Sequence, residues 1–346
     1  MADRLVSEAR ETKLLTAARG GDEDAFRELV APYRGELHAH CYRMLGSVQD
    51  AEDALQDALL RAWRGLDGFE ERSSLRSWLY RVTTNSAIDL LNRRPKRVLP
   101  FEHGPAWDPS DPMGEAITEP VWLEPYPDEL LDTGQPIVGP AARYELRESV
   151  ELAFGAALQH LPARQRAVLI LRDALGFSAK EVAQALDTTV ASVTSALQRA
   201  RSSIQERLPD ESQQATMRRL GDPAIRNLIN AYVSAWEAGD VDGIVQLLTD
   251  DIRIEMPPIP TWYHGREAAA RFLAEIAFTG DGRSVKLIPT WASGQIAFGS
   301  YRVEPGATDF TPYVLQVLRL RGDEISEIHG FLEEDHTAYG LPARLN

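Results

Sequence analysis

The sequence predicts a multidomain protein, with two all-α segments up to residue 208 and an α+β domain after them. Three observations lead to this prediction. At 346 residues the chain exceeds the usual size of a single domain. Apolar residues recur at three- and four-residue steps over 11–97 and 141–208, which is typical of amphipathic helices. Beyond residue 222, helical patterns give way to a run of alternating strands.

The composition excludes several classes of protein. The chain carries 37 Lys and Arg against 52 Asp and Glu, a formal net charge of −15. No segment approaches the roughly 18 continuous apolar residues that a membrane span needs, and the charged N-terminus lacks the apolar core of a secretory signal. The single cysteine, Cys41, has no partner for an internal disulfide. We therefore expect a cytoplasmic protein with no membrane partner.

A linker divides the two helical segments. Between 98 and 140 the sequence holds nine prolines, many carboxylates and neither Lys nor Arg, a composition that cannot sustain helix or ladder hydrogen bonds. Trp122, Leu123 and Tyr126 are apolar enough to indicate that part of the linker docks on another surface. The predicted division is 10–97, a linker at 98–140, 141–208, a short linker at 209–221, and 222–346.

Two helices are predicted in the first segment. DAEDALQDALLRAW (50–63) has one apolar face and one polar, mostly acidic face. After a loop at 65–72, LRSWLYRVTTNSAIDLLNRR (75–94) resumes helical spacing. A basic cluster follows at its end, formed by Arg93, Arg94, Lys96 and Arg97.

The stretch SAKEVAQALDTTVASVTSALQRAR (178–201) predicts a helix-turn-helix. Ser178 and Glu181 match the reciprocal capping box that starts a helix, and Thr189 is expected to cap the second helix. Four apolar residues of the second helix are spaced to pack inward: Val193, Leu197, Ala200 and Ile204. The polar side presents Thr194, Ser195, Gln198, Arg199 and Arg201. This arrangement suits a helix that enters a DNA major groove.

The C-terminal segment predicts an α+β domain. Helices are expected at 227–240 and 266–278, and a first strand at 252–256. Four further strands are expected, VKLIPTWAS, QIAFGSYRVE, YVLQVLRLR and EISEIHGF, and a Gly-Asp turn joins the last two.

Together these motifs resemble a known family. The two helical segments are similar to regions 2 and 4 of an extracytoplasmic-function (ECF) sigma factor of the sigma-70 family. The C-terminal segment resembles a SnoaL-like domain of the NTF2-like cone fold, so the three-part order looks like the actinobacterial SigG/SigJ-like group. The resemblance covers nearly the whole chain. It implies a sigma factor that binds core RNA polymerase, directs it to promoter DNA and helps melt that DNA, with no catalytic residue and no cofactor.

The resemblance implies a role for each helical motif. The partners in core polymerase are the β′ clamp helices and the β flap. The residues that match the clamp-binding face are Asp53, Gln56, Asp57 and Arg61. An acidic strip suits a basic partner, and a merely solvated helix face is the plain alternative.

Promoter DNA is the second partner that the resemblance implies. The residues that match the −10 reader are Arg76, Trp78, Arg81 and Asn85, with the loop 70–77 forming a pocket for an extruded base. Trp78 at helical spacing could instead belong to the core. The basic cluster 93–97 suits phosphate contacts, although a solvated helix end is the alternative.

The helix-turn-helix matches the −35 reader, with Thr194, Ser195, Gln198, Arg199 and Arg201 as its contacts. The family commonly has basic residues where Thr194 and Ala196 stand here. Fewer cations displace fewer counterions, so we expect weak DNA binding by this region alone. The acidic linker matches the segment that threads the polymerase active-site cleft, and a solvated tether is the alternative.

The C-terminal domain raises the question of catalysis. Candidate cavity residues are Glu255, His264, His329 and Glu333, but acid–base chemistry would need two of them to converge in one pocket. We expect instead a domain that contacts the sigma-like regions or responds to a small-molecule ligand in its cavity. No metal site is expected, because the spacing of His38, His40 and Cys41 cannot direct all three at one ion from a helix.

Two other functions compete with the sigma factor. One is a helix-turn-helix regulator that works without polymerase, which would need neither the 50–63 motif nor the Trp78 segment. The other is a SnoaL-like isomerase or cyclase with a DNA-binding appendage, which the lack of a sharp catalytic constellation disfavours.

Overall fold

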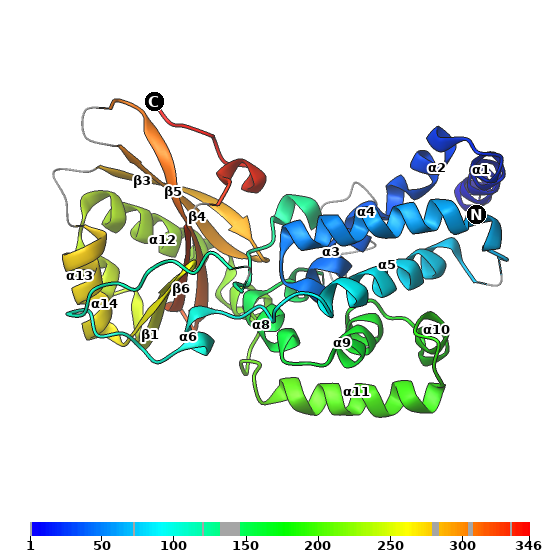
Figure 1. Cartoon of the computed structure of the whole chain (residues 1–346). Helices are drawn as coiled ribbons and strands as arrows, with labels where there is room; N and C mark the ends of the chain where they lie inside the picture. The colour runs from blue at the N-terminus through cyan, green and yellow to red at the C-terminus, as the bar shows by residue number, and fades with distance from the viewer. Residues whose placement is uncertain are drawn as a thin grey trace. The chain divides into compact units, whose positions relative to one another are not determined.

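The computed structural model describes residues 2–71, 73–119, 121–131, 146–278, 284–303, 307–332 and 334–346 (Figure 1). These residues fall into two compact units. The first holds the chain up to Pro95, residues 130–131 and Ala157–Arg207, and the second holds Lys96–Glu129, 146–156 and Leu208–Asn346. Within the described ranges, no helix combines the length and the apolar character needed to cross a bilayer.

The first unit begins with a helical bundle, as the apolar spacing predicts. Its helices are α1 (Ala2–Arg19), α2 (Glu23–Val30), α3 (Arg34–Leu45), α4 (Val48–Gly65) and α5 (Leu75–Leu91). Ser47 and Ser74 cap α4 and α5 by accepting hydrogen bonds from backbone N–H groups of the first turn. The apolar face of α4 is buried at Ala51, Ala54, Leu55, Ala58 and Ala62.

The rest of the first unit contains the helix-turn-helix. It comprises α9 (Ala163–Leu169), a π turn at Ile170–Ala174, α10 (Ala179–Ala185) and α11 (Val190–Gln205), while α8 (Leu152–Gln159) crosses the boundary between the units. The predicted capping box is confirmed, because Glu181 N donates to Ser178 Oγ over 3.2 Å and Ser178 N donates to Glu181 Oε2 over 2.8 Å. Thr189 caps α11, and the four inward-spaced residues of α11 are buried.

The second unit is built on one mixed sheet of the order β2-β1-β6-β5-β4-β3 in the described chain. The strands are β1 (Leu248–Met256), β2 (Ile259–His264), β3 (Val285–Ala292), β4 (Gln295–Val303), β5 (Phe310–Arg321) and β6 (Glu324–Leu332). All neighbours are antiparallel except β1 and β6. Strand β2 was not predicted, because Pro257, Pro258 and Pro260 give the segment the composition of a loop.

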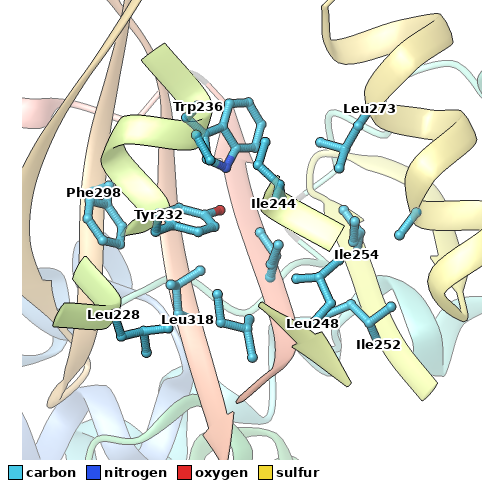
Figure 2. Close-up of a cluster of buried hydrophobic side chains, with 14 of the residues drawn as sticks. Leu228, Tyr232, Trp236, Ile244, Leu248, Ile252, Ile254, Leu273, Phe298 and Leu318 are labelled. Atoms are coloured by element: carbon cyan, nitrogen blue, oxygen red, sulfur yellow. The ribbon is translucent and has the colours of Figure 1, made fainter. Parts of the chain in front are cut away.

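One face of the sheet packs against the helices α12 (Gln213–Ala238), α13 (Val241–Val245) and α14 (Arg266–Phe272). Figure 2 shows the apolar side chains that fill the space between them, among them Tyr232, Trp236, Phe298 and Leu318. Helix α12 is kinked at Gly221, whose φ of 77° favours glycine, and Pro223 lies two residues further on. This face is therefore a packed core.

Part of the linker lies against the other face of the sheet. Trp122, Leu123 and Tyr126 are buried, and Leu99 and Leu123 pack with Leu315 and other apolar residues of that face. The prediction that part of the linker docks is confirmed. The prediction that its composition permits no helix was wrong for a 3-10 turn at Asp128–Leu131 and for α6 (Pro100–His103). The proline at the first helical position suits α6, because its φ is already helical and it needs no N–H partner there.

Candidate functional site

The polar face of α4 lies open in the first unit. Asp53, Gln56 and Asp57 are exposed. Arg61 forms ion pairs of 2.8 Å with Asp57 on the same helix and with Asp89 on α5. Leu60, which lies in the same strip, is 56% exposed.

A pocket of about 380 Å³ lies next to Trp78 in the same unit. Trp78 is half-buried and packs on Phe69 with ring centroids 5.1 Å apart, so it both fills a core position and lines the pocket. Arg81 lines the pocket too, and Asn85 is exposed one turn further along α5. Of the predicted pocket loop 70–77, Arg72 lies outside the described residues.

The opposite wall of this pocket comes from the helix-turn-helix. It contributes Glu181, Gln184, Ala185 and Asp187. Arg76 joins the same two regions, because its guanidinium lies 4.9 Å from the ring centroid of Tyr80 and 5.1 Å from that of Phe177. Arg76 also donates to both carboxylate oxygens of Glu36 over 2.8 to 3.1 Å. In this state Arg76 therefore serves internal packing.

The basic cluster at 93–97 is divided. Arg93 and Lys96 are exposed, and Arg94 lies 3.4 Å from the buried carboxylate of Asp50. Arg97 belongs to the second unit, where it is buried and donates to Glu124 Oε1 and to the backbone oxygen of Trp122, both over 3.1 Å. Only part of the cluster is thus presented to solvent.

The outer face of α11 presents the predicted polar strip. Ser195, Gln198 and Arg199 line a shallow surface depression, and the Thr194 hydroxyl donates back to Val190 O over 3.0 Å. Arg201 is held by Asp173, with guanidinium-to-carboxylate distances of 2.7 and 2.8 Å.

Two of the predicted cavity residues of the second unit do converge. His329 Nδ1 and Glu255 Oε1 are hydrogen-bonded, and each side chain is only 2% exposed. His329 Nε2 lies 3.1 Å from Glu327 Oε2. Burial alone would lower the pKa of His329, but the two carboxylates outweigh it and raise the pKa to about 9.

This cluster lies on the sheet face that carries the linker. Ile254 and Ile328 are partners in the apolar core beneath α12, so the next pair along the strands, Glu255 and His329, points to the opposite face. His264 is exposed on β2, and Glu333 lies outside the described residues. Sequence reasoning missed Glu327, although a strand period of two places it on the same face as His329.

The three residues considered for a metal have other surroundings. His40 is buried, and its Nε2 lies 2.8 Å from Thr84 Oγ1. Burial lowers the pKa of His40 to about 3 and raises that of the Cys41 thiol. In the described part of the chain no group of three His, Cys, Asp or Glu side chains is placed to hold a metal ion.

Similarity to known proteins follows the same three-part order. Family models match "Sigma-70 region 2" at residues 29–97, "Sigma-70, region 4" at 151–204 and "SnoaL-like domain" at 229–328. The ECF RNA polymerase sigma factor SigG of Mycobacterium tuberculosis is 42% identical over 331 residues, which cover 94% of this chain and 86% of that protein. The chain belongs to the ECF sigma factor family.

Further relatives agree with this assignment. The ECF sigma factor SigW of Bacillus subtilis is 27% identical over 57% of this chain and 96% of its own length. The crystal structure of the ECF sigma factor SigJ of M. tuberculosis has a TM-score of 0.53 and 21% identity, covering 89% of this chain and 97% of that one, which shows a shared fold.

The family resolves the competing functions. As an ECF sigma factor the protein binds core RNA polymerase and promoter DNA in transcription initiation, and it is not an enzyme. A sigma factor does not require catalysis by the buried Glu255–His329 pair. The two competing functions, a regulator that works without polymerase and a SnoaL-like enzyme, are therefore set aside.

Proposed function

We propose that the sigma factor docks on the β′ clamp helices through Asp53, Gln56, Asp57 and Arg61, while region 4 meets the β flap. One observation carries this proposal: the polar strip of α4 is exposed on a capped helix and has Leu60 within it. An apolar side chain surrounded by polar ones is the composition of a protein–protein contact with a desolvated centre.

For the promoter, we propose that α5 and the loop before it capture the −10 element while α11 recognises the −35 element. The pocket beside Trp78 and Arg81 supports the first assignment, because it pairs an aromatic ring with a guanidinium. The carboxylates of Glu181 and Asp187 line the same pocket and would repel a phosphate backbone. We therefore expect weak capture of the −10 strand until polymerase separates α10 from α5.

The remaining cations of these elements are proposed to contact phosphates. Arg93, Arg94 and Lys96 suit the DNA upstream of the melted segment, and Arg199 and Arg201 suit the edges of the −35 groove. Arg97 would first have to leave Glu124, and Arg76 would have to leave Glu36.

We propose that the tail modulates activity by holding the linker, in response to a small-molecule ligand. Backbone bonds support this role, since Trp107 N donates to Trp262 O over 2.7 Å and Ile117 N to Pro258 O over 2.9 Å. A linker held in this way is not available to thread the polymerase cleft, as the family resemblance implies for this segment.

Core binding tests the first proposal. Removing the Asp53 and Gln56 side chains (Asp53→Ala with Gln56→Ala) should weaken the affinity for core polymerase about tenfold or more, the equivalent of one good interface contact. The matched control is Asp242→Ala on α13 with Gln246→Ala directly after it, which removes the same two exposed side-chain types from the tail. Equal affinity in the two double variants, or tight promoter binding without core, would contradict the proposal.

Transcription tests the tail. Truncation after about residue 215 would remove the sheet and expose Leu99 and Leu123, which pack on it. A single substitution in the linker avoids this side effect and is the more specific test. Phe101→Ala loosens α6, and run-off transcription should change while core binding persists. The control is Met113→Ala, because Met113 is a linker residue that is 38% exposed. An unchanged transcript yield in Phe101→Ala would refute the proposal that the tail modulates activity by holding the linker.

A further inference from the structure

The second unit carries a pocket that docking and promoter recognition do not use. It has a volume of about 580 Å³ and lies where the start of α12 meets β1, β2, β5 and β6. Volumes of this size are typical of small-molecule sites. His264, one of the predicted cavity residues, lines it.

Four arginines line the pocket, and they differ in how many carboxylates balance their charge. Arg219 pairs with Glu211 over 3.0 Å, and Arg321 donates to both oxygens of Asp251, so each has a carboxylate of its own. The other two, Arg253 and Arg319, share the single carboxylate of Glu327.

The shared carboxylate is itself deeply buried. Glu327 is 5% exposed, and its second oxygen faces His329, which in turn faces Glu255. With a protonated His329, this cluster holds three cations and two carboxylates. In addition, Arg319 Nε is buried and has no hydrogen-bond partner within the described chain. The side chains of Arg253 and Arg319 are only partly buried, at 32% and 17% exposed. An unpaired buried donor and an excess of positive charge around it are both unfavourable unless an anion offsets them.

We propose that this pocket binds a small oxyanion, a carboxylate or phosphate group of a metabolite, through Arg253 and Arg319, with His264 at the rim. Both guanidiniums present planar N–H pairs that match such groups. The carboxylates of Asp210, Glu211 and Asp251 also line the pocket, and they oppose a long polyanion such as DNA. The inference rests on the proposed ligand response of the tail and names its site and chemistry.

The same site touches the linker. The ring of Phe101 on α6 lies 4.3 Å from the Arg253 guanidinium, and Phe101 N donates to Glu255 Oε2 over 3.4 Å. An anion that binds Arg253 therefore changes the net charge next to Phe101 on α6. Ligand binding and linker docking share one guanidinium, which gives the coupling a physical route.

Direct binding tests the site. The full-length protein is titrated with inorganic phosphate and with succinate at constant ionic strength, and binding is followed by calorimetry, with succinamide as the uncharged control. Saturable binding of either probe is expected, and Arg253→Gln should weaken it about tenfold, the loss expected for one charge-assisted contact. Preference for succinate assigns a carboxylate ligand, and preference for phosphate assigns a phosphorylated one.

Two further variants keep the test decisive. Arg271→Gln removes an exposed arginine of α14 that pairs with Glu275 and does not line the pocket, and it should bind as the parent does. Arg319→Gln, which removes the other proposed ligand, should weaken binding even if Arg253→Gln folds poorly. No saturable binding, or equal affinity in the parent and both pocket variants, overturns the site. Binding without any effect on transcription would instead leave the site intact and refute the modulatory role.

Discussion

Arg201 and Asp173 form a bidentate ion pair, in which the π turn after α9 holds a guanidinium of α11. The carboxylate thereby occupies a side chain that we propose for a promoter phosphate. Under that proposal, an acidic residue outside the helix-turn-helix would tune promoter recognition by region 4.

Replacing that acid should strengthen promoter binding. In Asp173→Asn the guanidinium is free to meet a phosphate, so promoter complexes of the holoenzyme should become tighter. Their salt dependence should steepen by about one counterion. Filter binding over a range of salt concentrations measures both quantities. Asp242→Asn on α13 is the charge-matched control, and an unchanged salt slope in Asp173→Asn would show that Arg201 does not contact DNA.

The capping box of α10 should contribute measurably to region 4. Ser178→Ala removes the acceptor for Glu181 N, and loss of such a cap costs about 1 kcal/mol. Amide hydrogen exchange of α10 in the full chain should rise accordingly. Ser202→Ala, an exposed serine inside α11, should leave that exchange unchanged. If both variants exchange alike, the cap contributes nothing.

Stability of the tail should fall as the pH rises from mildly acidic to neutral. Glu151 accepts hydrogen bonds from Gln213 N and Gln214 N, and burial raises its pKa from 4.5 to about 7. The folded chain thus keeps a proton that the unfolded chain releases. The resulting stabilisation is complete below pH 4.5 and is lost as the pH rises through about 7.

Thermal unfolding between pH 5 and 8 checks this expectation. In Glu151→Gln the decline of the melting temperature with pH should be shallower. It should not vanish, because burial raises the pKa of Glu334 to about 7 as well. Glu267→Gln, at an exposed position of α14, serves as the control. If the melting temperature of Glu151→Gln declined with pH as steeply as that of the parent, the Glu151 carboxyl would already be ionised in the folded chain.

A buried hydrogen bond should hold α12 to the sheet. The Tyr232 hydroxyl donates to Gln316 Oε1 over 2.7 Å within the core of Figure 2. Tyr232→Phe leaves that oxygen unpaired, which costs about 1 to 3 kcal/mol in unfolding free energy. Denaturant unfolding measures the loss. Tyr313→Phe on β5, which is 41% exposed, should change little, and equal effects would count against the bond.

Much of the fold was predictable because it depends on local periodicity. The face of α4 and the caps at Ser178 and Thr189 follow from spacing and side-chain chemistry within a few residues. Strand β2 was not predictable in this way. Its prolines suit a loop, and only pairing with β1, where Glu255 opposes Trp262, makes it a strand.

The sequence indicated candidate site residues, which remain predictions, but it could not reveal which partners those residues bind in the folded chain. Arg76 and Arg201 stand where DNA contacts are expected, yet their partners Glu36 and Asp173 lie 40 and 28 residues away in sequence. Spacing cannot reveal such pairs. The convergence of Glu255 with His329 depends likewise on the parallel pairing of β1 with β6, which no local pattern specifies.

The attachment of the linker to the sheet has a consequence for its length. Besides the bonds of Trp107 and Ile117, Tyr126 N donates to Ser293 Oγ over 2.9 Å, so the segment is fixed at successive points. A free tether gains or loses residues at little cost. Here one inserted residue would shift every later contact out of step with its partner, as a register slip does in a strand. The contacts with the sheet therefore constrain the length of the linker between the two helical regions.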